Sequence, residues 1–158
     1  MKLQNPLSVV AVLLILASAA YAQESFPKAG QAVYVVAVKS SRQRDLSTEQ
    51  KVKDEFEKHN SFKIAASLQS ADFVFLIFVE YEFNQMMFNN VGAGVEDVKR
   101  VAALVVSPDE YARRENDLDG LRDKALWQTS ENNNARRTGN LPKKVVNKFH
   151  EDTVTKKL

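Results

Sequence analysis

Cysteine is absent from all 158 residues, and several other residues that build functional sites are scarce. Without cysteine the chain has no disulfide, no thiolate metal ligand, no cysteine nucleophile and no lipid-modified N-terminal cysteine. It contains no Asn-x-Ser/Thr glycosylation acceptor and only two histidines, His59 and His150. A secreted eukaryotic domain of this size often carries cysteines or such acceptors. Their joint absence favours a bacterial exported protein.

Motifs for catalysis and cofactor binding are missing as well. His59 and His150 each stand alone near a predicted helix end, so we expect surface or capping roles rather than metal binding. No G-x-S-x-G nucleophile motif occurs. The glycines of Gly92-Ala93-Gly94 lack the third glycine and the following lysine of a phosphate-binding loop. We therefore expect no enzyme active site, no cofactor and no resident metal.

The charge balance is close to neutral, with 22 basic and 20 acidic residues. A chain with this balance has no electrostatic need for a nucleic-acid partner. The basic residues concentrate over 136–157, where they form a solvated helix face and tail or, alternatively, a surface weakly attracted to an anionic envelope.

The first 22 residues have the pattern of a secretory signal peptide. Lys2 precedes a short apolar segment that ends in small residues, with Ala20 and Ala22 placed as signal peptidase requires. We expect cleavage after Ala22 and a periplasmic or secreted location. The alternative is a retained membrane anchor, but the apolar segment falls short of the ~20 residues that span a bilayer. After cleavage we expect no stable membrane span.

The longest apolar run outside that segment is Asp72–Phe83, which predicts a strand through the middle of a sheet. Its odd positions are apolar throughout, whereas its even positions are apolar only between Asp72 and Glu80. Because side chains alternate across a strand, one face is predicted to be buried along its whole length and the other only in its centre. We expect helices on the fully apolar face, and a smaller cover or a second subunit on the other.

The remaining pattern predicts a few elements around that strand. The expected strands and helices are Ala32–Val38, Phe62–Ala66, Val98–Val106 and Lys124–Ser130, and then Thr48–Lys58 and Leu141–Thr153. Ser47 and Asn140 are the expected N-caps of the two helices. The predicted fold is a single α+β domain over 32–158, after the signal peptide (1–22) and a linker (23–31). Its one mixed, mostly antiparallel sheet has four or five strands, with two helices on one face.

Asn84–Asp97 is predicted to be a hairpin excursion, a loop longer than a tight turn needs and of the kind that is often functional. Its apolar residues either pack over the half-covered sheet face or form a patch for a partner. Together with the even face of the central strand they give a candidate interaction surface, which consists of Val74, Leu76, Phe78, Met86, Met87 and Phe88.

Two acidic groups are weaker candidates. Glu115–Gly120 partly matches a calcium loop, but Glu115 stands where aspartate is preferred, and Leu126 stands at the final ligand position. A charged turn is the expected structure. Glu80 and Glu82 lie on one strand face and suit either an acid/base pair or a solvated strand end, and we favour the solvated end.

The order of the segments Val33–Val38, Thr48–Lys58, Ser70–Phe75, Ala125–Trp127 and Leu141–His150 resembles that of small bacterial envelope domains. Such domains occur at the N-terminus of the translocation protein TolB and in curli-secretion and penicillin-binding-protein-activator lipoproteins. The late segments also resemble secreted proteins of soil bacteria. This resemblance implies a non-enzymatic module that binds other proteins, and no catalytic residues carry over from it.

The leading functional prediction is therefore an exported, non-catalytic interaction module. Its partner would be an envelope or secreted protein, or a second copy of the chain as a homodimer. The alternative is a protein that binds a small ligand or metal ion through the 84–97 loop and the 115–120 acidic turn.

Overall fold

A computed structural model describes residues 26–39, 41–88, 91–132 and 140–155, with the backbone alone described over 82–88 and 91–97 and at 155. One mixed sheet of five strands runs through it, in the order β2-β1-β3-β4-β5. In chain order the strands are β1 (Ala32–Lys39), β2 (Lys63–Ile64), β3 (Phe73–Phe88), β4 (Val91–Val106) and β5 (Trp127–Asn132). β1 pairs in parallel with β2 and β3, and β4 pairs antiparallel with β3 and β5. The predicted mixed sheet, with its central strand, is confirmed.

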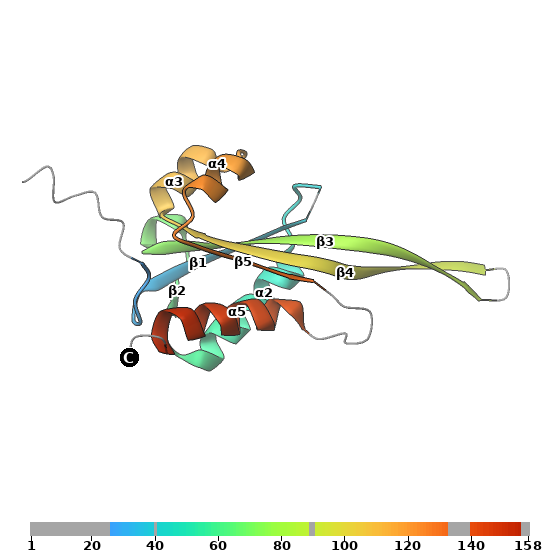
Figure 1. The fold of residues 1–158 in the computed structure, drawn as a ribbon, viewed down its shortest axis with the longest axis horizontal. Helices are drawn as coiled ribbons and strands as arrows, with labels where there is room; N and C mark the ends of the chain where they lie inside the picture. Colours follow the sequence, from blue (N-terminus) through green and yellow to red (C-terminus); the bar gives the residue numbers. More distant parts are fainter. Residues whose placement is uncertain (1–25, 40, 89–90, 133–139, 156–158) are drawn as a thin grey trace, which may run out of the picture.

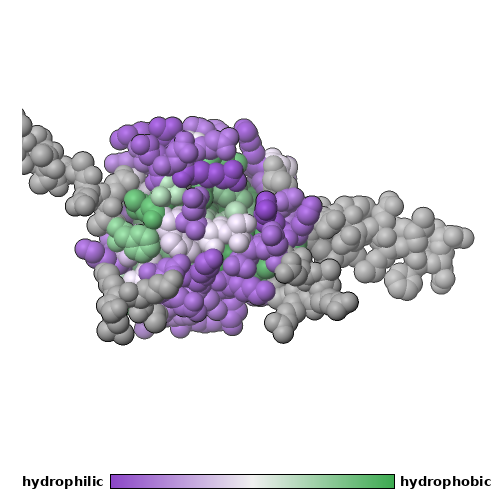
Figure 2. Space-filling view, viewed as in Figure 1, coloured by the Kyte–Doolittle hydropathy of each residue, from purple (hydrophilic) through white to green (hydrophobic). Residues whose placement is uncertain are grey.

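Helical layers lie on both faces of this sheet (Figure 1). The helical segments are α2 (Leu46–His59), η1 (Leu68–Ser70), α3 (Pro108–Arg114), α4 (Leu118–Asp123), α5 (Leu141–His150) and a final π-helical turn, η2 (Glu151–Thr155). Helices α2 and α5 cover one face, which we call the first face, and α3 and α4 cover part of the other, the second face. Figure 2 shows hydrophilic atoms over both layers and hydrophobic atoms in the band between them. Among the described residues, no helix is long and apolar enough to cross a membrane.

The first face holds an aromatic core, as the strand pattern predicts. Phe73, Phe75 and Ile77 of β3 are at most 2% exposed beneath α2 and α5. Phe149 of α5 lies at the centre of this core, with its ring 5.2 Å from that of Phe75 and 5.0 Å from that of Trp127, centre to centre. Burying such a side chain contributes about 1.5–3 kcal/mol to stability. These contacts hold α5 against the sheet.

The second face has a smaller cover. Tyr111 of α3 and Leu121 of α4 pack with Val74 and Leu76 of β3. The sequence predicts a smaller cover here but no helix within it, and it predicts a charged turn over Glu115–Gly120. The segment instead forms two short helices, each burying a single large side chain, which is too sparse for a visible helical period.

Beyond the body of the sheet, β3 and β4 continue as a two-stranded ribbon (Figure 1). Eight further residue pairs, from Tyr81↔Val98 to Phe88↔Val91, follow a register shift next to Glu80. The hairpin predicted over Asn84–Asp97 is therefore present, but most of it is paired strand and not the long loop that was expected. Asn and Gly residues in the stretch favour a turn, but only 89–90 lie between the two strands.

The N-terminus of α2 is fixed by Asp45, not by the predicted cap Ser47. The Asp45 carboxylate accepts hydrogen bonds from the Thr48 N–H at 3.1 Å, from the Thr48 hydroxyl at 3.0 Å and from the Tyr81 hydroxyl of β3. Desolvation by burial raises the pKa of Asp45, but the hydrogen bonds from Tyr81 and Thr48 outweigh it, so the net pKa is lowered. One carboxylate thus joins α2 to the base of the ribbon.

Replacing Asp45 by alanine is expected to lower the free energy of unfolding by about 2–3 kcal/mol, because a helix cap is lost and buried hydroxyls lose their acceptor. The matched control Ser47→Ala, at an exposed site in the first turn, should change it by less than about 0.5 kcal/mol. Urea unfolding of both variants measures the difference. Equal losses would show that Asp45 is not the functional cap.

Candidate functional site

The second face of the sheet is only partly covered, and its uncovered part is the best candidate site. Going from α4 toward the ribbon, the cross-strand pair Leu76↔Leu104 is buried, and the next pair, Phe78↔Ala102, is half-buried. The pair after that is charged, Glu80↔Arg100. The face therefore changes from apolar to charged within three rows, as the even positions of the central strand predict.

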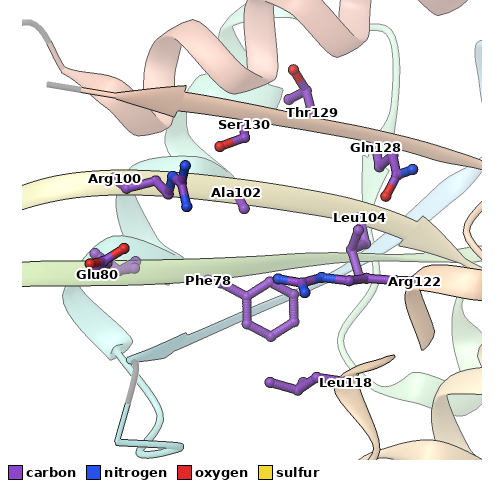
Figure 3. Close-up of a pocket in the computed structure, with 11 residues that line it drawn as sticks. Phe78, Glu80, Arg100, Ala102, Leu104, Leu118, Arg122, Gln128, Thr129 and Ser130 are labelled. Atoms are coloured by element: carbon purple, nitrogen blue, oxygen red, sulfur yellow. The ribbon is translucent and has the colours of Figure 1, made fainter. Parts of the chain in front are cut away.

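A hollow of about 560 Å³ lies over these rows (Figure 3). We call it the sheet hollow. Its apolar lining includes Phe78, Ala102 and Leu104 from the sheet and Leu118 from α4. Its polar lining consists of Glu80, Arg100, Arg122, Gln128, Thr129 and Ser130. Its volume is within the usual range of small-molecule sites, but it is open to one side, which also suits contact with a protein.

The charged groups of the sheet hollow are weakly paired. Arg122 lies 3.5 Å from Asp119, which is 94% exposed, and Glu80 lies 3.6 Å from Lys99. Arg100 donates to the side-chain oxygen of Asn132 at 2.9 Å. Exposed pairs of this kind contribute little to stability, so these side chains remain available to a partner.

The predicted interaction surface is divided by the structure. Val74 and Leu76 are at most 2% exposed beneath α3 and α4, so neither can contact a partner. Phe78 lines the sheet hollow. The side chains of Met86, Met87 and Phe88 lie outside the described residues, although the backbone places all three in the ribbon. As a binding surface, Phe78 and the ribbon remain a prediction.

Sequence reasoning missed Arg100 and Arg122, which line the sheet hollow from β4 and α4. Arg100 carried one usable signal, because it stands directly before the apolar run Val101–Val106. Arg122 carried none, since α4 itself was not predicted.

Asp117 and Glu80, one from each acidic candidate group, both have structural partners. Asp117 caps α4 by accepting the Gly120 N–H at 3.0 Å. Glu80 pairs with Lys99, and the side chain of Glu82 lies outside the described residues. Within the described part of the chain, no group of three or more histidine or acidic side chains could hold a metal ion.

Comparison with known proteins gives only distant likenesses. No family model matches the chain, and no curated protein matches it. Two structures of the PelC dodecamer from Paraburkholderia phytofirmans resemble it, each with a TM-score of 0.42. The unaltered PelC is 14% identical to this chain, and a point variant is 13% identical. Each likeness covers 80% of this chain, together with 90% of the unaltered PelC chain and 91% of the variant chain. A lipoprotein B from Nitrosomonas europaea has TM-score 0.35 and 13% identity over 82% of this chain and 77% of its own.

These likenesses are too distant to assign a role. The predicted kinship with envelope domains stays a prediction.

A histidine pair joins the ends of α2 and α5. The rings of His59 and His150 stack with their centres 4.3 Å apart and their planes 18° from parallel. His59 Nε2 lies 2.7 Å from the Asn147 side-chain oxygen, and His150 Nε2 lies 2.7 Å from the Ser61 hydroxyl. The prediction that each histidine stands alone is therefore wrong, because it rested on spacing along the chain.

The pKa of His150 is lowered, first by desolvation and then by the nearby charge of His59, against a smaller opposing effect of Glu151. The unfolded chain therefore takes up a proton at His150 more readily than the folded protein does. The stability that His150 contributes is fully present above its ordinary pKa of 6.5 and is lost as the pH falls through its lowered folded value.

We expect the free energy of unfolding to decrease from about pH 7.5 to about pH 5.5, where most carboxylates remain charged. The variant His150→Gln should show a shallower decrease over the same range. Urea unfolding at several pH values measures both slopes. Identical slopes would exclude His150 as a source of the pH dependence.

Proposed function

We propose that this protein is an exported, non-catalytic interaction module that binds a partner protein along the β3–β4 ribbon and the adjoining sheet hollow. The signal-peptide pattern of residues 1–22, which lie outside the described residues, supports export. The ribbon is the observation that carries the proposal of partner binding.

The ribbon extends beyond the two strands that flank it, β1 and β5. β1 pairs with β3 only as far as Val79, and β5 pairs with β4 only as far as Arg100. The eight pairs beyond that point have no third strand in the described part of the chain. They extend the ribbon by ~27 Å at about 3.4 Å per residue. A two-stranded hairpin without further packing is marginal in water, so a partner would stabilise it.

The edge of the ribbon is also suited to pairing. Soluble proteins usually protect a free edge with lysine, proline or a covering loop. Phe83–Phe88 contains no charged residue and no proline. Its unpaired backbone groups could accept a strand from another molecule, which is a common way of recognising extended segments. The added strand could come from a second copy of this chain or from a different protein.

The alternative of a ligand or metal site in the 84–97 loop and the acidic turn has less support. The loop is mostly paired strand, and Asp117 of the turn is occupied in capping α4.

The test is a variant with a shortened ribbon. Glu82 and Asp97 form a directly opposed pair, so Phe83–Glu96 can be replaced by Asn-Gly, which closes a two-residue hairpin. The buried residues of the body lie outside the deletion, so the variant should fold. We expect crosslinking in intact cells to give a discrete larger species for the parent and none for the variant.

Two further variants provide a second test and a control. Met86→Lys with Met87→Lys keeps the ribbon length but charges its edge, and should also lose the crosslinked species. Lys51→Glu, at an exposed site on α2, should retain it. Light scattering of the crosslinked product distinguishes a second copy from a different partner. A shortened protein that is folded and crosslinks like the parent would contradict the proposal.

A further inference from the structure

A second hollow, of about 370 Å³, lies on the other side of Leu118 from the sheet hollow. We call it the β1 hollow, because Tyr34, Val36 and Val38 of β1 line it. The turn that follows β1, the short helix η1 and helix α3 enclose it. It is separate from the ribbon, and nothing in the proposed function uses it.

The wall of the β1 hollow is aliphatic. Val36, Val38 and Leu76 come from the sheet, Leu68 from η1 and Leu118 from α4. Such a surface favours the apolar body of a ligand over water.

Two phenol groups in this wall have unused hydrogen-bonding capacity. Tyr111 is 7% exposed, and among the described residues its hydroxyl has only a long contact of 3.5 Å to a Glu115 carboxylate oxygen. The Tyr34 hydroxyl has an equally long contact to Arg44. Good hydroxyl hydrogen bonds are 2.5–3.0 Å long, so neither hydroxyl makes a good hydrogen bond to another group in the described part of the chain. Burial, and then the charge of Glu115, raises the pKa of Tyr111 to about 12, so its hydroxyl remains a donor.

Two arginines stand at the same hollow. Arg44 is held in place by Glu49, with contacts of 2.9 and 3.1 Å, and Glu49 is 4% exposed and also bound by Lys53. Arg42 has no ion pair among the described residues. Glu115 is the carboxylate in the lining.

The backbone of Arg42 is unusual for its residue type. Its φ is +63°, in the left-handed region that glycine and asparagine adopt more readily. Strained residues of this kind are concentrated at ligand sites.

We propose that the β1 hollow binds a small organic anion, with a carboxylate head between Arg42 and the two tyrosine hydroxyls and an apolar body against Val36, Val38 and Leu68. The arginine supplies charge, the phenols supply directed donors, and the aliphatic wall excludes water from the body. This activity is distinct from partner binding at the ribbon.

The test uses phenylacetate as probe, followed by calorimetry and by amide chemical shifts. We expect saturable binding, with shifts in β1 and α3. Phenylacetamide, which has the same shape without the charge, should bind about tenfold more weakly or worse, because a hydrogen bond to a charged group is lost. Inorganic phosphate, which has charge but no apolar body, should not compete.

Three variants locate the site. Arg42→Asn introduces a residue that tolerates the left-handed backbone but carries no charge. It should weaken the binding of phenylacetate about tenfold. Tyr111→Phe keeps the packed ring and should weaken it severalfold. Arg113→Gln removes an arginine of α3 that lines neither hollow, and should leave binding unchanged.

The outcomes separate the two proposals. A folded ribbon-shortened variant should bind phenylacetate normally, whatever happens to its crosslinking. Absence of saturable phenylacetate binding, equal binding of the amide, or an unaffected Arg42→Asn would overturn the inference.

Discussion

Burial of β3 on both of its faces is the interaction on which the other elements depend. One face carries phenylalanines that require the broad cover of α2 and α5, and Phe149 of α5 contacts both Phe73 and Phe75. The other face is apolar only over Val74, Leu76 and Phe78, so two short helices suffice there. The size of each helical layer thus follows from the length of the apolar stripe beneath it.

The same constraint creates the surfaces that are open to ligands and partners. Because α3 and α4 are short, they leave a hollow on either side of Leu118. The two hollows differ in chemistry: the sheet hollow has weakly paired charges, while the β1 hollow has an aliphatic wall with two tyrosines, two arginines and Glu115. Protein contact suits the first and a small anion suits the second. The bridge from Asp45 to Tyr81 ties the ribbon base to α2.

Patterns of apolar residues predicted the sheet, its central strand and the two large helices, because burial imposes a period on the sequence. They did not predict α3 and α4, since Tyr111 and Leu121 are isolated apolar anchors in charged segments. The hairpin of the ribbon was predicted as a loop because Gly92 and Gly94 are turn-forming residues, although here they lie in a strand. Spacing along the chain placed His59 and His150 apart, although helix packing stacks them. The arginines of the hollows come from separate segments, so only the folded chain brings them to one face.

Residue-by-residue amide hydrogen exchange tests the central claim most directly. In dilute protein without a partner, the account predicts strong protection from Phe75 to Val79, where β3 pairs with β1 on one side and β4 on the other, and a steep decrease beyond Tyr81. Protection of Asn84–Phe88 should rise when the partner or a second copy binds. Equal, strong protection along the whole of β3 in dilute monomer would contradict the account, because the ribbon would then be stable by itself.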